Sequence, residues 1–232
     1  MLVRYSLISD ASGSFGGLVA SHNRSGQYIR TRVRPTNPSS PAQVEVRVIF
    51  GNLAITWSTL TDDQRDAWTT YAINVPVTNR LGDPLTLTGH QMFVRNNAAR
   101  IQAGLDRIDD GPTTFSTALL TKVFVNPNQQ PINLLESFFP VVDPWATDIG
   151  AAFLIYATRQ GSGTVLYRRN PYRFAGSFIG RETPPVPLQA LIPAPFELND
   201  NGSNHVFVRY FVVLSDGRMS PPVHERRLIK TT

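Results

Sequence analysis

Four stretches of the chain differ in how hydrophobic and polar residues alternate, and together they predict an α+β fold. Residues 1–40 hold short alternating runs rich in Gly, Ser and Arg, which predict an extended arm or β-hairpin. Apolar residues recur at helical spacing over 41–105, which predicts a small helical platform. Residues 106–131 are polar and contain Pro, as a linker does. Alternation rich in Val, Ile, Phe and Tyr over 132–232 predicts an antiparallel β-sandwich.

The arm is predicted to form two strands, SFGGLVASHN and GQYIRTRVRP, joined by a turn at 24–26. Alternate residues of a strand share a face, so one face of the second strand collects an aromatic ring and three cations. These residues are Tyr28, Arg30, Arg32 and Arg34. Pro35 has no backbone N–H and is expected to end the strand.

Three helices are predicted in the platform. The first is expected to begin with Ser40 as N-cap and Pro41 at the first helical position, where a missing N–H costs nothing. Its apolar side is expected to hold Val44, Val48, Leu53 and Trp57. The third covers GHQMFVRNNAARIQAGL, with Gly104 as its C-cap. The residues of this helix that we expect to face inward are Phe93, Ala98, Ile101 and Leu105.

The first and second helices are expected to form a hairpin with a tryptophan on each arm. The second helix, TDDQRDAWTTYA, opens with Thr61 and Gln64 at the spacing of a capping box. Asp62 and Asp63 follow, where the helix dipole favours negative charge. We expect the structural core of this hairpin to consist of Trp57, Leu60, Thr61, Gln64 and Trp68.

The last hundred residues are expected to form an immunoglobulin-like or fibronectin-like sandwich. A strand at 119–125 precedes it in the linker, and the final two strands turn at Ser215–Arg218, a hairpin signal. The chain lacks the cysteine pair and central tryptophan of a true immunoglobulin domain, so this topology rests on the strand pattern.

Composition narrows the classes of function. The net charge is +5, only 17% of residues are charged, and the only lysines are Lys122 and Lys230. An Arg-rich, Lys-poor surface fits contacts with protein or nucleic acid, and also fits an Arg-biased genome. The absence of cysteine excludes disulfides. We expect neither a membrane span nor secretion by the usual route, because no long apolar run is present.

No catalytic pattern emerges from the sequence. His22, His90, His205 and His224 are scattered, without metal-ligand spacing. No serine lies in G-x-S-x-G, and the glycines of 161–165 lack the Gly-Lys-Ser/Thr ending of a phosphate loop. We therefore predict a non-enzymatic protein without a cofactor or a metal.

The arm carries the strongest signal for an interface, through Arg24, Tyr28, Arg30, Arg32 and Arg34. Guanidinium groups on a strand face suit the carboxylates of an acidic protein surface, and they also suit phosphate. We favour protein contact over nucleic acid, because no known nucleic-acid fold follows the arm.

The sequence resembles an uncharacterised family that is associated with the structural genes of tailed bacteriophages. The resemblance covers about residues 16–105. It rests on NRSGQYIRTRVRPTNPSSPAQVEVR, on W-S-x-L-T-x-x-Q-R-x-A-W at Trp57–Trp68, and on G-x-P-L-x-L-T-G-x-x-x-F-x-R-N-N at Gly82–Asn97. The C-terminal sandwich is similar to immunoglobulin-like modules that decorate phage heads and tails.

The arm, the low charge content, the missing catalytic pattern and the resemblance lead to one hypothesis. The protein is expected to be a structural component of a tailed-phage virion, assembled in the host cytoplasm. It would be a capsid cement, decoration or minor head protein that binds neighbouring subunits through its arm, and we expect a homo-oligomer. Alternatives are a tail or head–tail connector component, a nucleic-acid-binding protein, and a host-surface carbohydrate binder that uses Tyr156, Tyr167, Tyr172 and Phe174.

Overall fold

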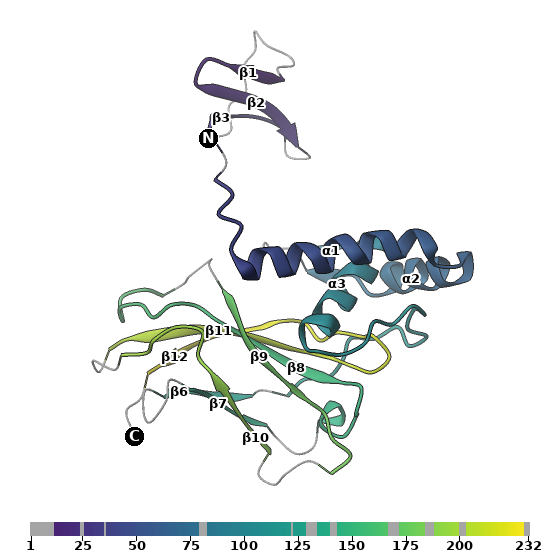
Figure 1. The fold of residues 1–232 in the computed structure, drawn as a ribbon, viewed down its shortest axis with the longest axis vertical. Helices are drawn as coiled ribbons and strands as arrows, with labels where there is room; N and C mark the ends of the chain where they lie inside the picture. The colour runs from purple at the N-terminus through teal and green to yellow at the C-terminus, as the bar shows by residue number, and fades with distance from the viewer. Residues whose placement is uncertain are drawn as a thin grey trace. The chain divides into compact units, whose positions relative to one another are not determined.

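The computed structural model is α+β, with three α-helices and four antiparallel sheets among its described residues (Figure 1). The chain forms two compact units, Met1–Val44 and Glu45–Thr232. The structure describes residues 12–23, 26–34, 36–78, 83–121, 123–128, 134–139, 143–166, 172–183, 188–199 and 203–229.

The first unit contains a three-stranded antiparallel sheet, the arm sheet, in which β2 lies between β1 and β3. Its strands are β1 (Gly13–Phe15), β2 (Leu18–Asn23) and β3 (Gly26–Thr31). The predicted hairpin is present, since Asn23 pairs with Gly26 across β2 and β3. β3 ends earlier than predicted, at Thr31, and only one further bond, from Arg32 N to Gly17 O at 2.7 Å, extends the ladder. The ladder therefore stops before Pro35, which lies outside the described residues.

The helices are α1 (Pro41–Thr59), α2 (Asp62–Asn74) and α3 (Gly89–Gln102). α1 begins at Pro41 and α2 opens with the capping box of Thr61 and Gln64, both as predicted. A second capping box, Thr88 with Gln91, opens α3 and repeats the Thr-x-x-Gln spacing.

α3 ends in a glycine motif close to the predicted one. Gly104 has φ +84° and follows the C-cap Ala103, so it is the residue after the cap. Its N–H donates to Ile101 O, and the Leu105 N–H donates to Arg100 O, which together satisfy the last carbonyls of the helix.

One side of α1 packs against α2 and α3, and this side differs from the predicted one. Leu53 is buried, and Ile49 and Trp57 pack against the same core. Val44 and Val48 are instead 45% and 53% exposed. The predicted side combined residues from two faces of the helix. Val48 and Leu53 are five residues apart, and at 3.6 residues per turn this spacing places them on different faces.

Two antiparallel sheets follow in the second unit. One has the strand order β12-β11-β8-β9 and the other β10-β7-β6. The strands are β6 (Phe124–Asn128), β7 (Leu134–Phe139), β8 (Ala152–Ala157), β9 (Arg173–Ile179), β10 (Leu188–Pro193), β11 (His205–Val213) and β12 (Val223–Leu228). Their side chains share one core, in which Phe153 and Tyr210 from the first sheet meet Leu135 and Ile192 from the second.

The strand predicted at 119–125 lies further along the chain, as β6. This strand contains Pro127, which is tolerated because β6 is the edge strand of its sheet. The predicted turn at Ser215–Arg218 is present, with Gly217 N donating to Leu214 O at 3.1 Å. A two-residue ladder, β4 (Val77–Thr78) with β5 (Pro84–Leu85), precedes α3.

The predicted linker, 106–131, contains the strand β6, and its residues 106–121 hold no helix or strand but are not a free connection. The Trp68 indole donates to Asp109 O at 2.9 Å, and Ala118 N donates to Met219 O at 3.2 Å. Most of α1, from Glu45 onward, accordingly belongs to one compact unit with α2, α3 and the two sheets.

Candidate interaction surfaces

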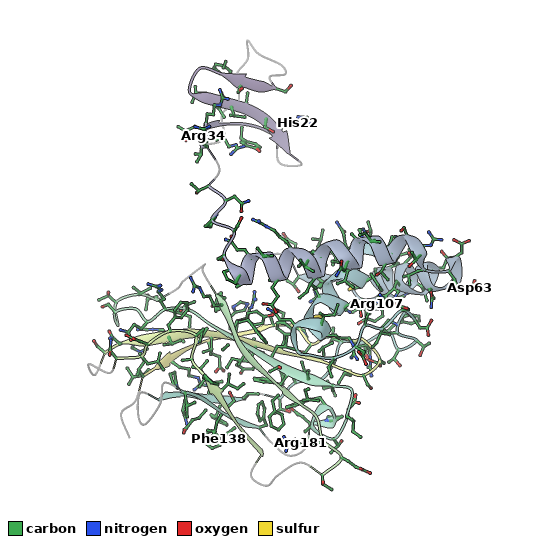
Figure 2. All side chains as sticks on the ribbon, viewed as in Figure 1. His22, Arg34, Asp63, Arg107, Phe138 and Arg181 are labelled. Atoms are coloured by element: carbon green, nitrogen blue, oxygen red, sulfur yellow. The ribbon has the colours of Figure 1, made fainter. Side chains whose placement is uncertain are left out.

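The arm sheet has two chemically different faces. Strand register places Phe15 opposite Leu18 and Ala20 opposite Ile29, so these four apolar residues share one face. The other face carries Tyr28 and Arg30, opposite Ser21 and Val19. Figure 2 shows the side chains that leave this sheet, with His22 and Arg34 labelled.

Neither face of the arm sheet forms a core of its own. Among its described residues only Ala20 is buried, while Phe15 is 56% exposed and Leu18 37%. A small sheet needs a covered apolar face to be stable by itself. The arm sheet therefore presents an apolar face that an interaction partner can cover.

The arginines of the arm are exposed. Arg30, Arg32 and Arg34 all lie open to solvent, and none belongs to an ion pair within the described part of the chain. Tyr28 is half-buried, and Arg24 lies outside the described residues. No Asp or Glu occurs between Ala11 and Val44, so the described residues of the arm have no acidic side chain to neutralise these cations.

Both tryptophans of the helical hairpin contact α3. The rings of Trp57 and Trp68 each lie with their centroids 5.6 Å from that of Phe93. Trp68 is fully buried and Leu60 is 5% exposed. Thr61 and Gln64 form the capping box, and Gln64 Nε2 also donates to Asp110 at 2.9 Å. Trp57, Leu60 and Trp68 thus belong to the apolar core, whereas Thr61 is exposed and acts with Gln64 only as the cap of α2.

Sequence analysis did not predict a set of buried polar residues on α3. Asn96 donates to Gly217 O at 2.8 Å, and Asn97 exchanges hydrogen bonds with the backbone of Ile108. Arg100 donates to the carbonyls of Asp106, Gly150 and Leu214. The pair of adjacent asparagines in the Arg-Asn-Asn motif was the sequence signal for these residues. A buried amide side chain usually forms hydrogen bonds, and often with backbone groups. These residues join the helices to the four-stranded sheet.

The described residues hold no group of three or more His, Cys, Asp or Glu side chains that could bind a metal ion. Burial raises the pKa of Tyr156 and of Tyr210 to about 12, which leaves both phenols protonated at neutral pH. Burial, with the nearby Arg209 charge, lowers the pKa of His224.

The aromatic residues considered for carbohydrate binding are largely engaged in packing. Tyr156 donates to the Gln102 side chain and stacks on Phe211 at 5.7 Å. Tyr172 and Phe174 are half-buried, and Tyr167 lies outside the described residues. No open aromatic platform follows from the described members of this set.

A shallow pocket of about 350 Å³ lies between α1 and α3 and is lined by Phe50, His90, Gln91, Val94 and Arg95. Its walls are mostly apolar. His90 Nε2 is buried without a hydrogen-bond partner, and its ring lies 5.4 Å from that of Trp57. The lining offers no pair of groups that could act as nucleophile and base.

Comparison with known proteins adds no relatives: no protein-family model, curated protein or solved structure matches the chain. None of the described helices is both long and apolar enough to cross a membrane.

Proposed function

We propose that the protein is a non-enzymatic structural component of a tailed-phage virion that binds neighbouring subunits through its arm sheet. Its place would be that of a capsid-associated cement, decoration or minor head protein, with capsid or tail subunits as partners. The observation that carries the proposal is the arm sheet itself. It is amphipathic and buries only Ala20 among its described residues, which is the expected state of an element that becomes ordered on a partner.

The arrangement of the arm supports two kinds of contact at once. Phe15 and Leu18 supply apolar area on one face, and Arg30 supplies a charged donor on the other. The strand β3 lies at the edge of its sheet, so its outer backbone groups can pair with a strand of a neighbour. Bidentate Arg–carboxylate pairs would then fix the register.

The strand order of the second unit supports an immunoglobulin-like or fibronectin-like sandwich. A three-stranded sheet, β10-β7-β6, faces a four-stranded one, β12-β11-β8-β9. Seven strands in this split, with the last hairpin at one edge, match the architecture of such domains. A module of this kind would project from the particle or bridge two subunits.

Deletion of residues 1–40 tests the proposal in particles purified from cells that carry the gene. We expect the amount of particle-bound protein, measured by quantitative mass spectrometry, to fall by about tenfold or more, the ratio that corresponds to 1.4 kcal/mol of lost binding. Undiminished incorporation would reject the arm as the binding element.

A sharper version compares two triple variants. Arg30, Arg32 and Arg34 are replaced by Gln in the first. The charge-matched control replaces the exposed Arg159, Arg173 and Arg181 of the second unit, which lie over the rings of Phe196 and Phe178. Both variants remove three positive charges, so a general effect of net charge would lower incorporation equally. We expect a loss only in the arm variant.

Phosphate is the second candidate partner for the arm, because Arg30, Arg32 and Arg34 are exposed cations without acidic neighbours in their own sheet. Nucleic-acid binding predicts an affinity for duplex DNA that falls steeply with salt. A plot of the logarithm of the binding constant against the logarithm of the salt concentration should have a slope near −0.9 per phosphate contact. The same arm variant would reduce that slope. Absence of binding at about 50 mM salt would remove this candidate.

A further inference from the structure

A row of aromatic and cationic side chains crosses the outer face of the four-stranded sheet, beside the part on which α3 packs. Leu154 and Phe211 of this face share a cluster with Ala99 of α3. The next pairs of the ladder lie directly opposite one another, and opposite residues of an antiparallel sheet share a face. From β12 to β9, the residues of this Arg209 row are His224, Arg209, Tyr156 and Phe174.

Two aromatic rings hold the guanidinium group of Arg209. Its Cζ lies 4.5 Å from the centroid of the Tyr156 ring and 5.3 Å from that of Tyr172. The Tyr172 ring also contacts His224, with centroids 5.7 Å apart. Tyr156 is anchored in turn, because its hydroxyl donates to the Gln102 side chain of α3. Contact with the face of a ring uses no hydrogen-bond acceptor, so the five N–H donors of the guanidinium still require partners.

The described part of the chain does not supply these partners. Nε of Arg209 is buried without a hydrogen-bond partner, and the guanidinium takes part in none of the ion pairs of the described residues. Nε of Arg226 is buried in the same condition, although another nitrogen of that side chain donates to Gly163 O. Arg226 follows His224 by two residues on β12 and is therefore a diagonal neighbour of Arg209 on this face. A buried donor without a partner is costly, above all when it is charged.

The other side of β12 shows how the fold satisfies an arginine from within. Arg227 alternates with Arg226, and its Nε donates to Glu225 at 2.8 Å. Glu225 is the only acidic residue of β12 and lies on the same side as Arg227, whereas β8, β9 and β11 contain no Asp or Glu. The strands therefore give the outer face two cations and no carboxylate.

We propose that Arg209, with Arg226 beside it, binds an oxyanion group of a ligand, either a carboxylate or a phosphate. Guanidinium groups form paired hydrogen bonds with both. Solvent reaches the row, because His224 is exposed and Arg209 is only half-buried. The site lies within the second unit and is independent of the proposed function, which concerns the arm sheet. We expect a small dianion to bind with a dissociation constant on the order of 1 mM.

Thermal unfolding of the full chain tests the site with inorganic phosphate and malonate as probes, at constant ionic strength. At about twenty times the expected dissociation constant, a bound probe should raise the midpoint of unfolding by several degrees. A rise with malonate alone assigns the site to carboxylates, and a rise with phosphate alone assigns it to phosphates. No rise with either probe would overturn the proposal.

Two variants separate binding from the general stabilisation that phosphate gives to proteins. R209M keeps an unbranched stem over Tyr156 and removes every N–H donor, so it should fold and lose the rise. R181M is the charge-matched control, because Arg181 is exposed and lies 5.7 Å from the centroid of the Phe178 ring. We expect R181M to keep the rise. Equal rises in R209M and the unchanged protein would reject Arg209 as the binding residue.

Nuclear magnetic resonance of the histidine rings locates the probe in the unchanged protein, without reliance on a variant at Arg209. The chain has four histidines, and H224Q assigns the signals of His224. We expect these signals to shift and to saturate with a dissociation constant on the order of 1 mM. The signals of His90, whose ring lies 5.4 Å from that of Trp57, should stay in place. Shifts of all the histidines that grow with probe concentration and do not saturate would overturn the proposal.

Discussion

The arm sheet and the four-stranded sheet β12-β11-β8-β9 are both antiparallel, yet they differ in what lies on their faces. Phe153 and Val212 face the three-stranded sheet, whereas Leu154 and Phe211 face Ala99 of α3. The arm sheet buries only Ala20 among its described residues. Hydrogen bonding alone gives a sheet little stability, and most of it comes from the apolar area covered by a neighbouring layer. The uncovered faces are therefore the places to look for function.

Among the changes that test this contrast between the two sheets, Trp68→Ala should have the largest effect on stability. The side chain is fully buried against Phe93 and its indole donates to Asp109 O. The cavity and the lost hydrogen bond should lower the free energy of unfolding by about 3–5 kcal/mol. Urea unfolding monitored by circular dichroism measures this change. A loss below about 1 kcal/mol, the size of an average point substitution, would mean that the hairpin core is not a stability centre.

The second largest effect is expected from alkaline pH, which should lower the stability of the second unit. Burial raises the pKa of Tyr156 and of Tyr210 to about 12. Because the folded pKa exceeds the unfolded value of about 10, the stabilisation is complete below pH 10 and is lost as pH rises toward 12. Each ring contributes roughly 3 kcal/mol, since its pKa rises from about 10 to about 12 and one pKa unit corresponds to about 1.4 kcal/mol. Ultraviolet titration should show phenols that ionise later than an exposed tyrosine, and a single normal phase would contradict this.

Asn96→Ala should have a smaller effect on the same unit. The amide is fully buried and donates to Gly217 O, so its removal leaves a buried carbonyl without a partner. We expect a loss of about 1–3 kcal/mol in the free energy of unfolding. Asn74→Ala is a suitable control, because Asn74 is exposed and bonds only within α2. Equal losses in the two variants would argue against a special role for Asn96.

The smallest effect is expected in the arm. Phe15→Ser should change the free energy of unfolding by no more than about 0.5 kcal/mol, because the ring is 56% exposed and leaves no cavity. The same variant should reduce particle binding if the apolar face is the contact. A destabilisation comparable with that of Trp68→Ala would show that the arm sheet has a core of its own, and the contrast between the two sheets would fail.

Local signals in the sequence were sufficient to predict several features. The capping box at Thr61, the start of α1 at Pro41 and the hairpin of β2 with β3 each depend on residues that are close together in the chain. Such features require no knowledge of the tertiary contacts.

Features that depend on distant partners were not predictable in the same way. The buried side of α1 is decided by where α2 and α3 lie, and the sequence offered two apolar sides, one through Val48 and one through Leu53. The edge position that lets β6 accept Pro127 depends on strand order in space. For the candidate surfaces, the pattern of Arg30, Arg32 and Arg34 was visible in the sequence, whereas the exposure of Phe15 and of Val48 became visible only with the fold.

Arg100 has a consequence for the order of folding. Its guanidinium bonds to carbonyls that lie 6, 50 and 114 residues away in the chain. Contacts across long loops form late, because closure of the loop must precede them. We therefore expect the attachment of α3 to the sheet to follow the folding transition state. Arg100→Met should speed unfolding in stopped-flow experiments and leave the refolding rate nearly unchanged, whereas an equal loss in refolding rate would place this contact in the folding nucleus.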